Sequence, residues 1–268
     1  MNLDLYLERV GFQSNPKPDL ATLRALHRAH LLSIPYENLD IHLGHKLTLE
    51  LPHIFDKLVT EKRGGWCFEM NGLFAWVLEQ IGFEVTLLSA VVNQHLAGDK
   101  AEGNHLTLLV ELDKPYLVDV GFGDGPLEPL SLREGLHEQN GLEYRLKLAK
   151  NRWTFHHHQY GAAERFDFTL DEVELGTFSD ACQNLQASPE SGFVEVTVCQ
   201  LFTPNGLLSL RGAVLNRITA TGKQERAIRS ADEYTYVLAQ DFGLAVDAYH
   251  LWPQVWRGHL EWLRKSGI

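Results

Sequence analysis

Apolar residues recur every three or four positions in the first 82 residues, which is the pattern of helices that bury one face. A first stripe covers residues 3–10, and a second begins after Asp19, a residue type that caps helices. Pro35 stops the second helix, because a proline disfavours helical geometry in the residue before it. A third stripe runs from the Arg63-Gly-Gly65 break to Gly82, a residue suited to a left-handed helix end. The pattern therefore predicts a helical region at the start of the chain.

The hydrophobic period changes after residue 83, where short runs rich in leucine and β-branched residues predict strands. The turn residues Asp113-Lys-Pro115 predict a hairpin between two of these runs, and Thr203-Pro-Asn-Gly206 predicts a second turn. Helices return at Asp232–Asp241 and at Pro253–Lys265, where proline suits the first helical turn. The predicted strands are Val85–Val92, His105–Leu112, Tyr116–Val120, Tyr144–Leu148, Arg152–Phe155, Val194–Leu201 and Leu207–Leu210.

The order of these elements is helices, then antiparallel strands, then a mixed region. Because the strands do not alternate with crossover helices, a doubly wound sheet is excluded and we expect an α+β fold. The 268 residues are 44% hydrophobic and 22% charged, which excludes bulk disorder. A chain of this length buries a sufficient core without disulfides or a structural metal.

The net charge of −11, from 24 Lys and Arg against 35 Asp and Glu, argues against a nucleic-acid-binding surface, which needs basic residues for phosphate contacts. The first residues lack a basic start followed by an apolar core, so no signal peptide is expected. The longest apolar runs reach about a third of a membrane span. We therefore expect a cytoplasmic protein that binds neither nucleic acid nor a membrane.

The three cysteines, Cys67, Cys182 and Cys199, lie far apart and form no CxxC pair. Their odd number and spacing argue against a disulfide framework and against a cysteine zinc site. The chain also lacks HExxH, so no catalytic metal is expected. The run His156-His-His158 alternates along a strand, which favours a solvated face over a metal site.

Cys67 follows two glycines and opens the third predicted helix. At such a place, free backbone N–H groups and the positive end of the helix dipole stabilise a thiolate and can face a developing oxyanion. A thiolate nucleophile also needs a base, and the base needs a group that orients it. Without such partners, Cys67 is equally well explained as a small buried hydrophobe.

Two residues in the predicted hairpin have the right chemistry to be these partners. His105 begins one apolar strand, and Asp119 lies inside the next, where a carboxylate is costly to bury without a partner. If Leu112 faces Tyr116 across the turn, odd-numbered residues of both strands share one face, so His105 and Asp119 lie on the same side. That register leaves them several residues apart along the sheet. A bulge, a wider turn or strong twist is needed to bring them together.

The segment Arg63-Gly-Gly-Trp-Cys-Phe-Glu-Met-Asn71 closely resembles the active-site motif RGGxCxExN of the arylamine N-acetyltransferase family. Three further blocks resemble that family in the same order along the chain. They are Ile34-Pro-Tyr-Glu-Asn-Leu-Asp40, Asn104-His-Leu-Thr-Leu-Leu-Val110 and Val118-Asp-Val-Gly-Phe-Gly123. Together with the N-terminal helix and the Thr203–Gly206 turn, the resemblance spans most of the chain.

This resemblance implies a Cys67–His105–Asp119 triad in a transglutaminase-like core. It also implies acetyl-CoA as the acyl donor and a primary aromatic amine, hydrazine or hydroxylamine as the acceptor. The implied architecture is a helical bundle over residues 1–83 that carries the nucleophile, an antiparallel β-barrel over 84–190 that carries the histidine and the aspartate, and an α/β lid over 191–268.

Further site residues follow from the same resemblance. Phe122 is placed in the acceptor pocket, and Tyr36 and Phe202 are further candidates for it, with core packing as their alternative role. The expected CoA contacts are Gly123, Thr203 and Gly206. Two departures from the family pattern concern donor binding. The loop after Gly123 is made acidic by Asp124 and Glu128, and Leu207 replaces the basic residue that usually follows the turn.

Three residues near the nucleophile have predicted supporting roles. Glu69 and Asn71 lie in the first turn of the active-site helix, where capping and packing support are favoured over direct chemistry. Arg63 is a candidate partner of Glu37 or Glu69, with a plain surface arginine as the alternative.

Three other functions use the same residues. An amide synthase of this fold would transfer a larger acyl group, and a transglutaminase-like thiol hydrolase has the same nucleophile, base and acid in the same chain order. A non-catalytic binding module is the third alternative. The intact cysteine, histidine and aspartate argue against the binding module.

Overall fold

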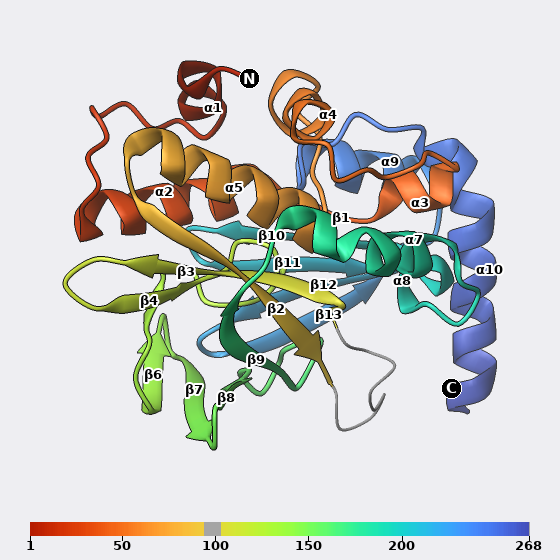
Figure 1. Ribbon diagram of the computed structural model, residues 1–268. Helices are drawn as coiled ribbons and strands as arrows, with labels where there is room; N and C mark the ends of the chain where they lie inside the picture. The colour runs from red at the N-terminus through yellow and green to blue at the C-terminus, as the bar shows by residue number, and fades with distance from the viewer. Residues whose placement is uncertain (94–102, 268) are drawn as a thin grey trace.

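The computed structural model describes residues 1–93 and 103–267, and its N-terminal region is helical, as the hydrophobic pattern predicts (Figure 1). Asp19 caps the second helix by accepting a 2.8 Å hydrogen bond from the Thr22 amide. Gly82 ends the fifth at a φ of 102°, in the left-handed region that glycine tolerates best. The elements of this region are α1 (Leu3–Arg9), α2 (Leu20–Ser33), β1 (Tyr36–Glu37), α3 (Leu39–Leu43), α4 (Leu51–Phe55), the π-helical turn η1 (Asp56–Thr60) and α5 (Cys67–Ile81).

Helix α5 is central to the molecule, because it is apolar nearly all round and most of its residues are buried. It packs against α1 and α4 on one side and against the strands β2 (Glu84–Val92) and β3 (His105–Glu111) on the other. The helix that begins at Cys67 is therefore fixed between the helical region and a sheet.

The expected β-barrel is an eight-stranded antiparallel sheet with the order β5-β4-β3-β2-β9-β8-β7-β6. Strands β5 and β6 are its two edges, so the barrel is open along one seam. The predicted hairpin is confirmed as β3 and β4. The strands that follow β3 are β4 (Pro115–Val118), β5 (Leu130–Ser131), β6 (Gly135–Gln139), β7 (Leu142–Ala149), β8 (Arg152–His156) and β9 (Arg165–Glu172).

A second antiparallel sheet, with the order β1-β10-β11-β12-β13, forms the C-terminal α/β region with α9 and α10 (Figure 1). Its apolar face packs on these two helices in a separate hydrophobic cluster. One of its strands, β1, comes from the N-terminal region. The remaining elements are the 3-10 helix η3 (Leu175–Phe178), α7 (Ser179–Ala187), α8 (Gly192–Glu195), β10 (Val198–Thr203), β11 (Gly206–Arg211), β12 (Val214–Thr219), β13 (Gly222–Ala227), α9 (Ala231–Gln240) and α10 (Ala248–Ser266).

Two predicted boundaries are wrong by several residues. The strand expected over Val194–Leu201 starts only at Val198, because Val194 and Glu195 belong to α8. The last helix begins at Ala248 rather than at Pro253, because Asp247 caps it by accepting a hydrogen bond from the His250 amide. The predicted domain limits at 83/84 and 190/191 stay a prediction. Within 1–93 and 103–267, no helix has the length and apolarity needed to cross a membrane.

Candidate active site

Cys67 is the first residue of α5, and its place is set by the tight turn before it. A Cβ atom on Gly64 would lie 2.1 Å from the Pro35 carbonyl oxygen, so only glycine fits there. The Gly65 amide donates to the same carbonyl at 3.2 Å. These contacts bring the chain into the helix at a fixed angle, with Cys67 buried at the helix start.

Acidic and basic side chains form a buried ionic network behind this turn. Arg63 donates to Glu37 at 2.7 Å and to Asp40 at 3.0 Å, so of its two predicted partners it pairs with Glu37 and not with Glu69. Lys57 bridges Asp40 at 2.8 Å and Glu69 at 2.9 Å. Burial would raise the pKa of Asp40, but the charges of Lys57 and Arg63 lower it to about 2. Glu69 also accepts from the Trp66 amide at 3.2 Å, which confirms the predicted capping role.

His105 and Asp119 lie side by side and both are buried. His105 is the first residue of β3, and its Nε2 lies 2.7 Å from Asp119 Oδ2. Burial alone would lower the pKa of His105, but the Asp119 carboxylate and a hydrogen bond with Cys67 raise it to about 10. Because Asp119 holds Nε2, the ring presents Nδ1 to Cys67. The same imidazolium keeps the pKa of Asp119 below its ordinary value despite burial.

Part of the separation left by the predicted hairpin register is removed because the three-residue turn lies one position earlier than expected, at residues 112–114. Tyr116 faces Val110 rather than Leu112, so each residue of β4 lies two positions closer to His105 than expected. An even shift keeps the same residues on the same face, so the side shared by His105 and Asp119 is preserved. Strand β4 ends at Val118, and Asp119 follows it instead of lying within it.

Asn71, one helical turn after Cys67, holds the carboxylate from behind. Its Nδ2 donates to Asp119 Oδ1 at 2.8 Å and to the Leu106 carbonyl at 2.6 Å. Its Oδ1 accepts from the Val120 amide at 2.9 Å. The supporting role expected for Asn71 thus becomes a specific one, which is to position Asp119.

His27 of α2 is a supporting residue that the sequence pattern does not reveal. Its Nδ1 lies 3.0 Å from the Leu127 carbonyl, and its Nε2 lies 3.4 Å from the Asp119 amide nitrogen. Burial lowers the pKa of His27 to about 4, so the ring is neutral. A neutral ring in this position donates to Leu127 and accepts from Asp119, which fixes the backbone of the aspartate.

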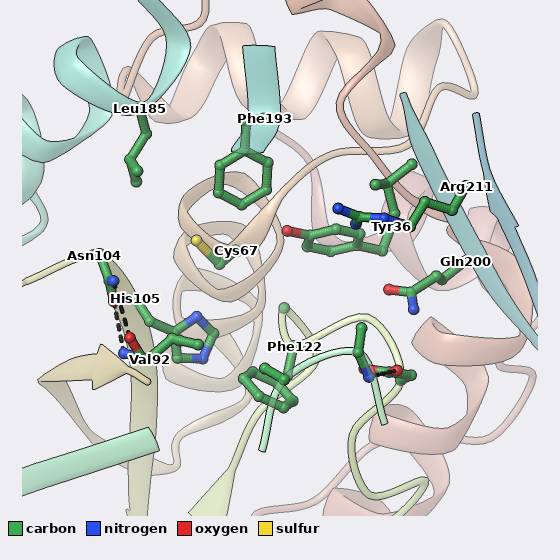
Figure 2. A pocket seen from close by; sticks show the side chains of 15 residues that line it. Tyr36, Cys67, Val92, Asn104, His105, Phe122, Leu185, Phe193, Gln200 and Arg211 are labelled. Atoms are coloured by element: carbon green, nitrogen blue, oxygen red, sulfur yellow. Dashed lines mark hydrogen bonds between the residues drawn. The ribbon is translucent and has the colours of Figure 1, made fainter. Parts of the chain in front are cut away.

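Cys67 and His105 open onto a cavity of about 220 Å³ (Figure 2). Two of the predicted acceptor-pocket residues, Phe122 and Tyr36, line it. The Phe122 ring stands edge-on to His105, with 5.3 Å between the ring centroids. The other residues that line the cavity are Val92, Asn104, Gly121, Asp124, Ala162, Ala163, Leu185, Phe193, Val198, Gln200 and Arg211.

The other predicted substrate and donor contacts lie elsewhere. Phe202, Thr203 and Gly206 line a second cavity of about 140 Å³ at the turn between β10 and β11. Gly123 lies between Phe122 and Asp124, which line the first cavity, and a Cβ atom on Gly123 would collide with the Gln200 side chain. Leu207, which replaces a basic residue, is buried in the core.

The acidic loop residue Asp124 is engaged within the protein. Its carboxylate accepts from the Ala162 amide at 2.8 Å, and its carbonyl lies 2.8 Å from His157 Nε2 and 3.1 Å from His158 Nε2. The prediction that this histidine run forms a solvated face is therefore wrong, because β8 ends at His156 and the next two rings turn inward. Within the described ranges, no group of three or more His, Cys, Asp or Glu side chains is arranged to hold a metal.

The other two cysteines are buried, and neither has a histidine partner among the described residues. Burial raises the pKa of Cys182 to about 12 and that of Cys199 well above its ordinary value. Only Cys67 combines a helix start, a histidine partner and a cavity. This arrangement can form a covalent thioester and release it to a second substrate.

The chain is similar to proteins of one family over nearly its whole length. The family model described as N-acetyltransferase matches residues 19–251. Arylamine N-acetyltransferase, pineal gland isozyme NAT-3, of Gallus gallus is 34% identical over 277 residues, which covers 92% of this chain and 95% of that protein. Arylamine N-acetyltransferase 1 of Homo sapiens is 35% identical over 239 residues, with 80% and 82% covered.

Solved structures of this kind share the fold. The arylamine N-acetyltransferase of Mycobacterium marinum in complex with CoA has a TM-score of 0.86 at 28% identity and covers 95% of this chain and 98% of its own. The enzyme from Salmonella typhimurium also has a TM-score of 0.86, at 27% identity, with 94% and 97% covered.

Proposed function

The chain belongs to the arylamine N-acetyltransferase family, and we propose that it transfers an acetyl group from acetyl-CoA to an aromatic amine or hydrazine through Cys67, His105 and Asp119. The observation that carries the assignment of residues is the hydrogen-bonded chain from Cys67 to His105 to Asp119 at the base of one cavity. The expected setting is the cytoplasm.

In the first half-reaction, the Cys67 thiolate attacks the carbonyl carbon of the acetyl thioester. The tetrahedral oxyanion that forms faces the backbone N–H groups at the start of α5. When the bond from carbon to the CoA sulfur breaks, the His105 imidazolium gives the leaving thiolate its proton. Asp119 keeps the ring oriented and stabilises its charged form. The product is acetyl-Cys67 and free CoA.

In the second half-reaction, the amine nitrogen attacks the acetyl carbon of acetyl-Cys67. The neutral His105 accepts the proton from nitrogen, the carbon–sulfur bond breaks, and the electron pair returns to Cys67. An aromatic amine is a weak base and is therefore a free nucleophile at neutral pH. The apolar and aromatic wall made by Phe122 and Phe193 suits the ring of such an acceptor.

The proposed donor contacts lie in the loop that contains Gly123 and in the turn between β10 and β11. Gly123 allows the loop beside the main cavity to approach Gln200 closely, and Thr203 and Gly206 belong to the turn that resembles the family's donor-binding segment. The Asp124 carboxylate is buried and accepts a hydrogen bond from the Ala162 amide, so an internal donor partly offsets its charge. We propose that CoA contacts Gly123, Thr203 and Gly206.

The test is to incubate the protein with acetyl-CoA in the absence of amine. One acetyl group should appear on the peptide that contains Cys67, with release of free CoA, and an anisidine should then remove it as an N-acetyl product. Initial rates should give the parallel lines of a ping-pong scheme. The variant Cys67→Ala should form no adduct, whereas Cys182→Ala should behave as the unmodified protein does.

Other outcomes would contradict the proposal. Consumption of acetyl-CoA at the same rate with and without amine would identify a thiol hydrolase. An adduct formed only from larger acyl donors would identify an amide synthase. Absence of any acyl adduct would show that the protein does not transfer the acetyl group through a covalent intermediate on Cys67.

A further inference from the structure

The hydroxyl of Tyr36 has no hydrogen-bond partner among the residues that the structure describes, although the side chain is only 9% exposed. It lines the cavity that holds Cys67 and His105. In Figure 2 its oxygen points into this cavity toward Cys67. The oxygen is open to the cavity and is not one of the fully enclosed polar atoms of the described residues that lack a partner. Its orientation indicates that it forms a hydrogen bond with a polar group of the bound substrate.

The backbone of Tyr36 is held by the turn that positions the nucleophile. Tyr36 forms a parallel bridge with Gly65 and pairs in antiparallel register with Gln200 of β10. The Glu37 amide next to it donates to the Gly65 carbonyl at 2.9 Å. The aromatic ring therefore extends from a fixed point close to Cys67, which is the condition for a preorganised donor.

The charges around Tyr36 keep its hydroxyl protonated. Burial and the neighbouring Cys67 raise the pKa of Tyr36 well above its ordinary value, although the positive charge of Arg211 acts in the opposite direction. Figure 2 shows the Arg211 guanidinium beside the Tyr36 ring. The hydroxyl is a donor at neutral pH, in an environment where a nearby cation also favours negative charge on a substrate oxygen.

We propose that Tyr36 is a further catalytic residue, whose hydroxyl donates a hydrogen bond to the acyl oxygen of the tetrahedral intermediate. This rests on the acetyl-transfer function proposed above. As the Cys67 sulfur bonds to the carbonyl carbon, the π electron pair moves to oxygen, and Tyr36 stabilises that charge without giving up its proton. When the pair returns, the bond to the CoA sulfur breaks and His105 protonates the thiolate.

The same oxygen becomes negative again when the amine attacks acetyl-Cys67, so Tyr36 serves both half-reactions. If Tyr36 only held the amine, its substitution would affect a different half-reaction. The acetylation half-reaction contains no amine, so loss of an amine contact cannot slow it. The acetylation rate in the absence of amine therefore separates the two roles.

The variant Tyr36→Phe removes only a hydroxyl that has no partner in the described residues, so we expect it to fold, as a melting curve would verify. Its rate of CoA release from acetyl-CoA without amine should fall on the order of 100-fold, which is typical for loss of one oxyanion donor. Alkylation of Cys67 by iodoacetamide should keep its rate, because that displacement forms no oxyanion. The control Tyr236→Phe, which removes an exposed hydroxyl on α9, should change neither rate.

Two results would overturn the inference. One is an acetylation rate within about twofold of the unmodified protein, whether or not the KM for the amine rises. The other is equal slowing of acetylation and alkylation, which would place the effect of Tyr36 on the thiolate. The proposed function is judged separately, because it stands or falls on formation of acetyl-Cys67 by the unmodified protein.

Discussion

Asn71 donates a 2.8 Å hydrogen bond to Asp119, so the helix that begins at Cys67 also orients the Asp119 carboxylate. The Gly121 amide donates to the same carboxylate oxygen, Oδ1, at 2.9 Å. Two donors thus fix Oδ1, and only Oδ2 is left to face His105. This asymmetry determines what a substitution at Asp119 does.

We expect Asp119→Asn to leave the fold largely intact and to lower turnover by about 10⁴, as in the serine-protease example of a triad aspartate. The two donors select the amide oxygen at the Oδ1 position, so the NH₂ group faces His105. The ring then accepts at Nε2 and carries its proton on Nδ1, where it cannot act as a base toward Cys67. Steady-state acetylation and a melting curve measure the two effects. Near-normal turnover with a normal melting curve would show that Asp119 is structural.

The substitution Asn71→Ala should lower both stability and turnover. It leaves the Val120 amide and the Leu106 carbonyl without their buried partner, at a cost of about 1–3 kcal/mol in the free energy of unfolding. Turnover should fall at constant KM for the amine, because Asn71 acts through Asp119. Urea denaturation and initial rates test this expectation, and an unchanged kcat in a destabilised protein would contradict it.

Iodoacetamide at mildly acidic pH should label Cys67 before the other cysteines. Cys67 lies beside the His105 imidazolium and at a helix start, which are the surroundings typical of a reactive cysteine. Burial keeps Cys182 and Cys199 protonated, with the pKa of Cys182 at about 12. Peptide mass spectrometry at partial modification gives the order of labelling. Equal labelling of all three thiols would remove the argument for an activated thiolate.

The contribution of His105 to stability should decrease as pH rises. Its pKa is about 10 in the folded protein and close to 6.5 in the unfolded chain, so the folded state holds the proton more tightly. The stabilisation is fully present below about pH 6.5 and is lost as the pH rises through about 10. The difference in free energy of unfolding between the protein and His105→Gln, measured in urea at several pH values, should shrink over that range. A constant difference would mean that His105 is neutral throughout.

Removal of the Arg63 charge should destabilise the protein strongly. In Arg63→Met, Glu37 loses its ion-pair partner while fully buried, which typically costs about 3–5 kcal/mol. The matched control is Arg24→Met, because Arg24 pairs with Glu128 at the surface, where a pair contributes about 0–1 kcal/mol. Equal losses in urea denaturation would show that burial of the network does not matter.

The helix starts and the hairpin could be predicted from the sequence because local signals determine them. Asp19, Gly82 and the turn at Asp113 each act through their own backbone neighbourhood. The register of the hairpin could not be read in this way, because it depends on how β2 and α5 pack on β3. The last helix was misplaced because the proline signal at Pro253 competed with a true cap at Asp247.

Strands at the exposed face of a sheet carry little pattern of their own. Strand β13, Gly222–Ala227, is almost entirely polar and is an edge strand paired only with β12, so its sequence gives no alternation to detect. In β9, Phe166 and Phe168 are buried, but Asp167 between them is buried too, so the alternation is weak. The inward turn of His157 and His158 depends on the distant Asp124 loop, and only the assembled fold reveals it.

The pairing of Tyr36 with Gln200 gives the active site a dependence on chain topology. One wall of the main cavity is made by two residues that lie far apart in the sequence, one from the N-terminal region and one from β10. Contacts between residues so distant in sequence form slowly, because loop closure costs entropy before the contact offsets it. Completion of this cavity therefore requires the whole chain as far as β10. A chain shortened before β10 would retain Cys67, His105 and Asp119 but would lack the strand that pairs with Tyr36.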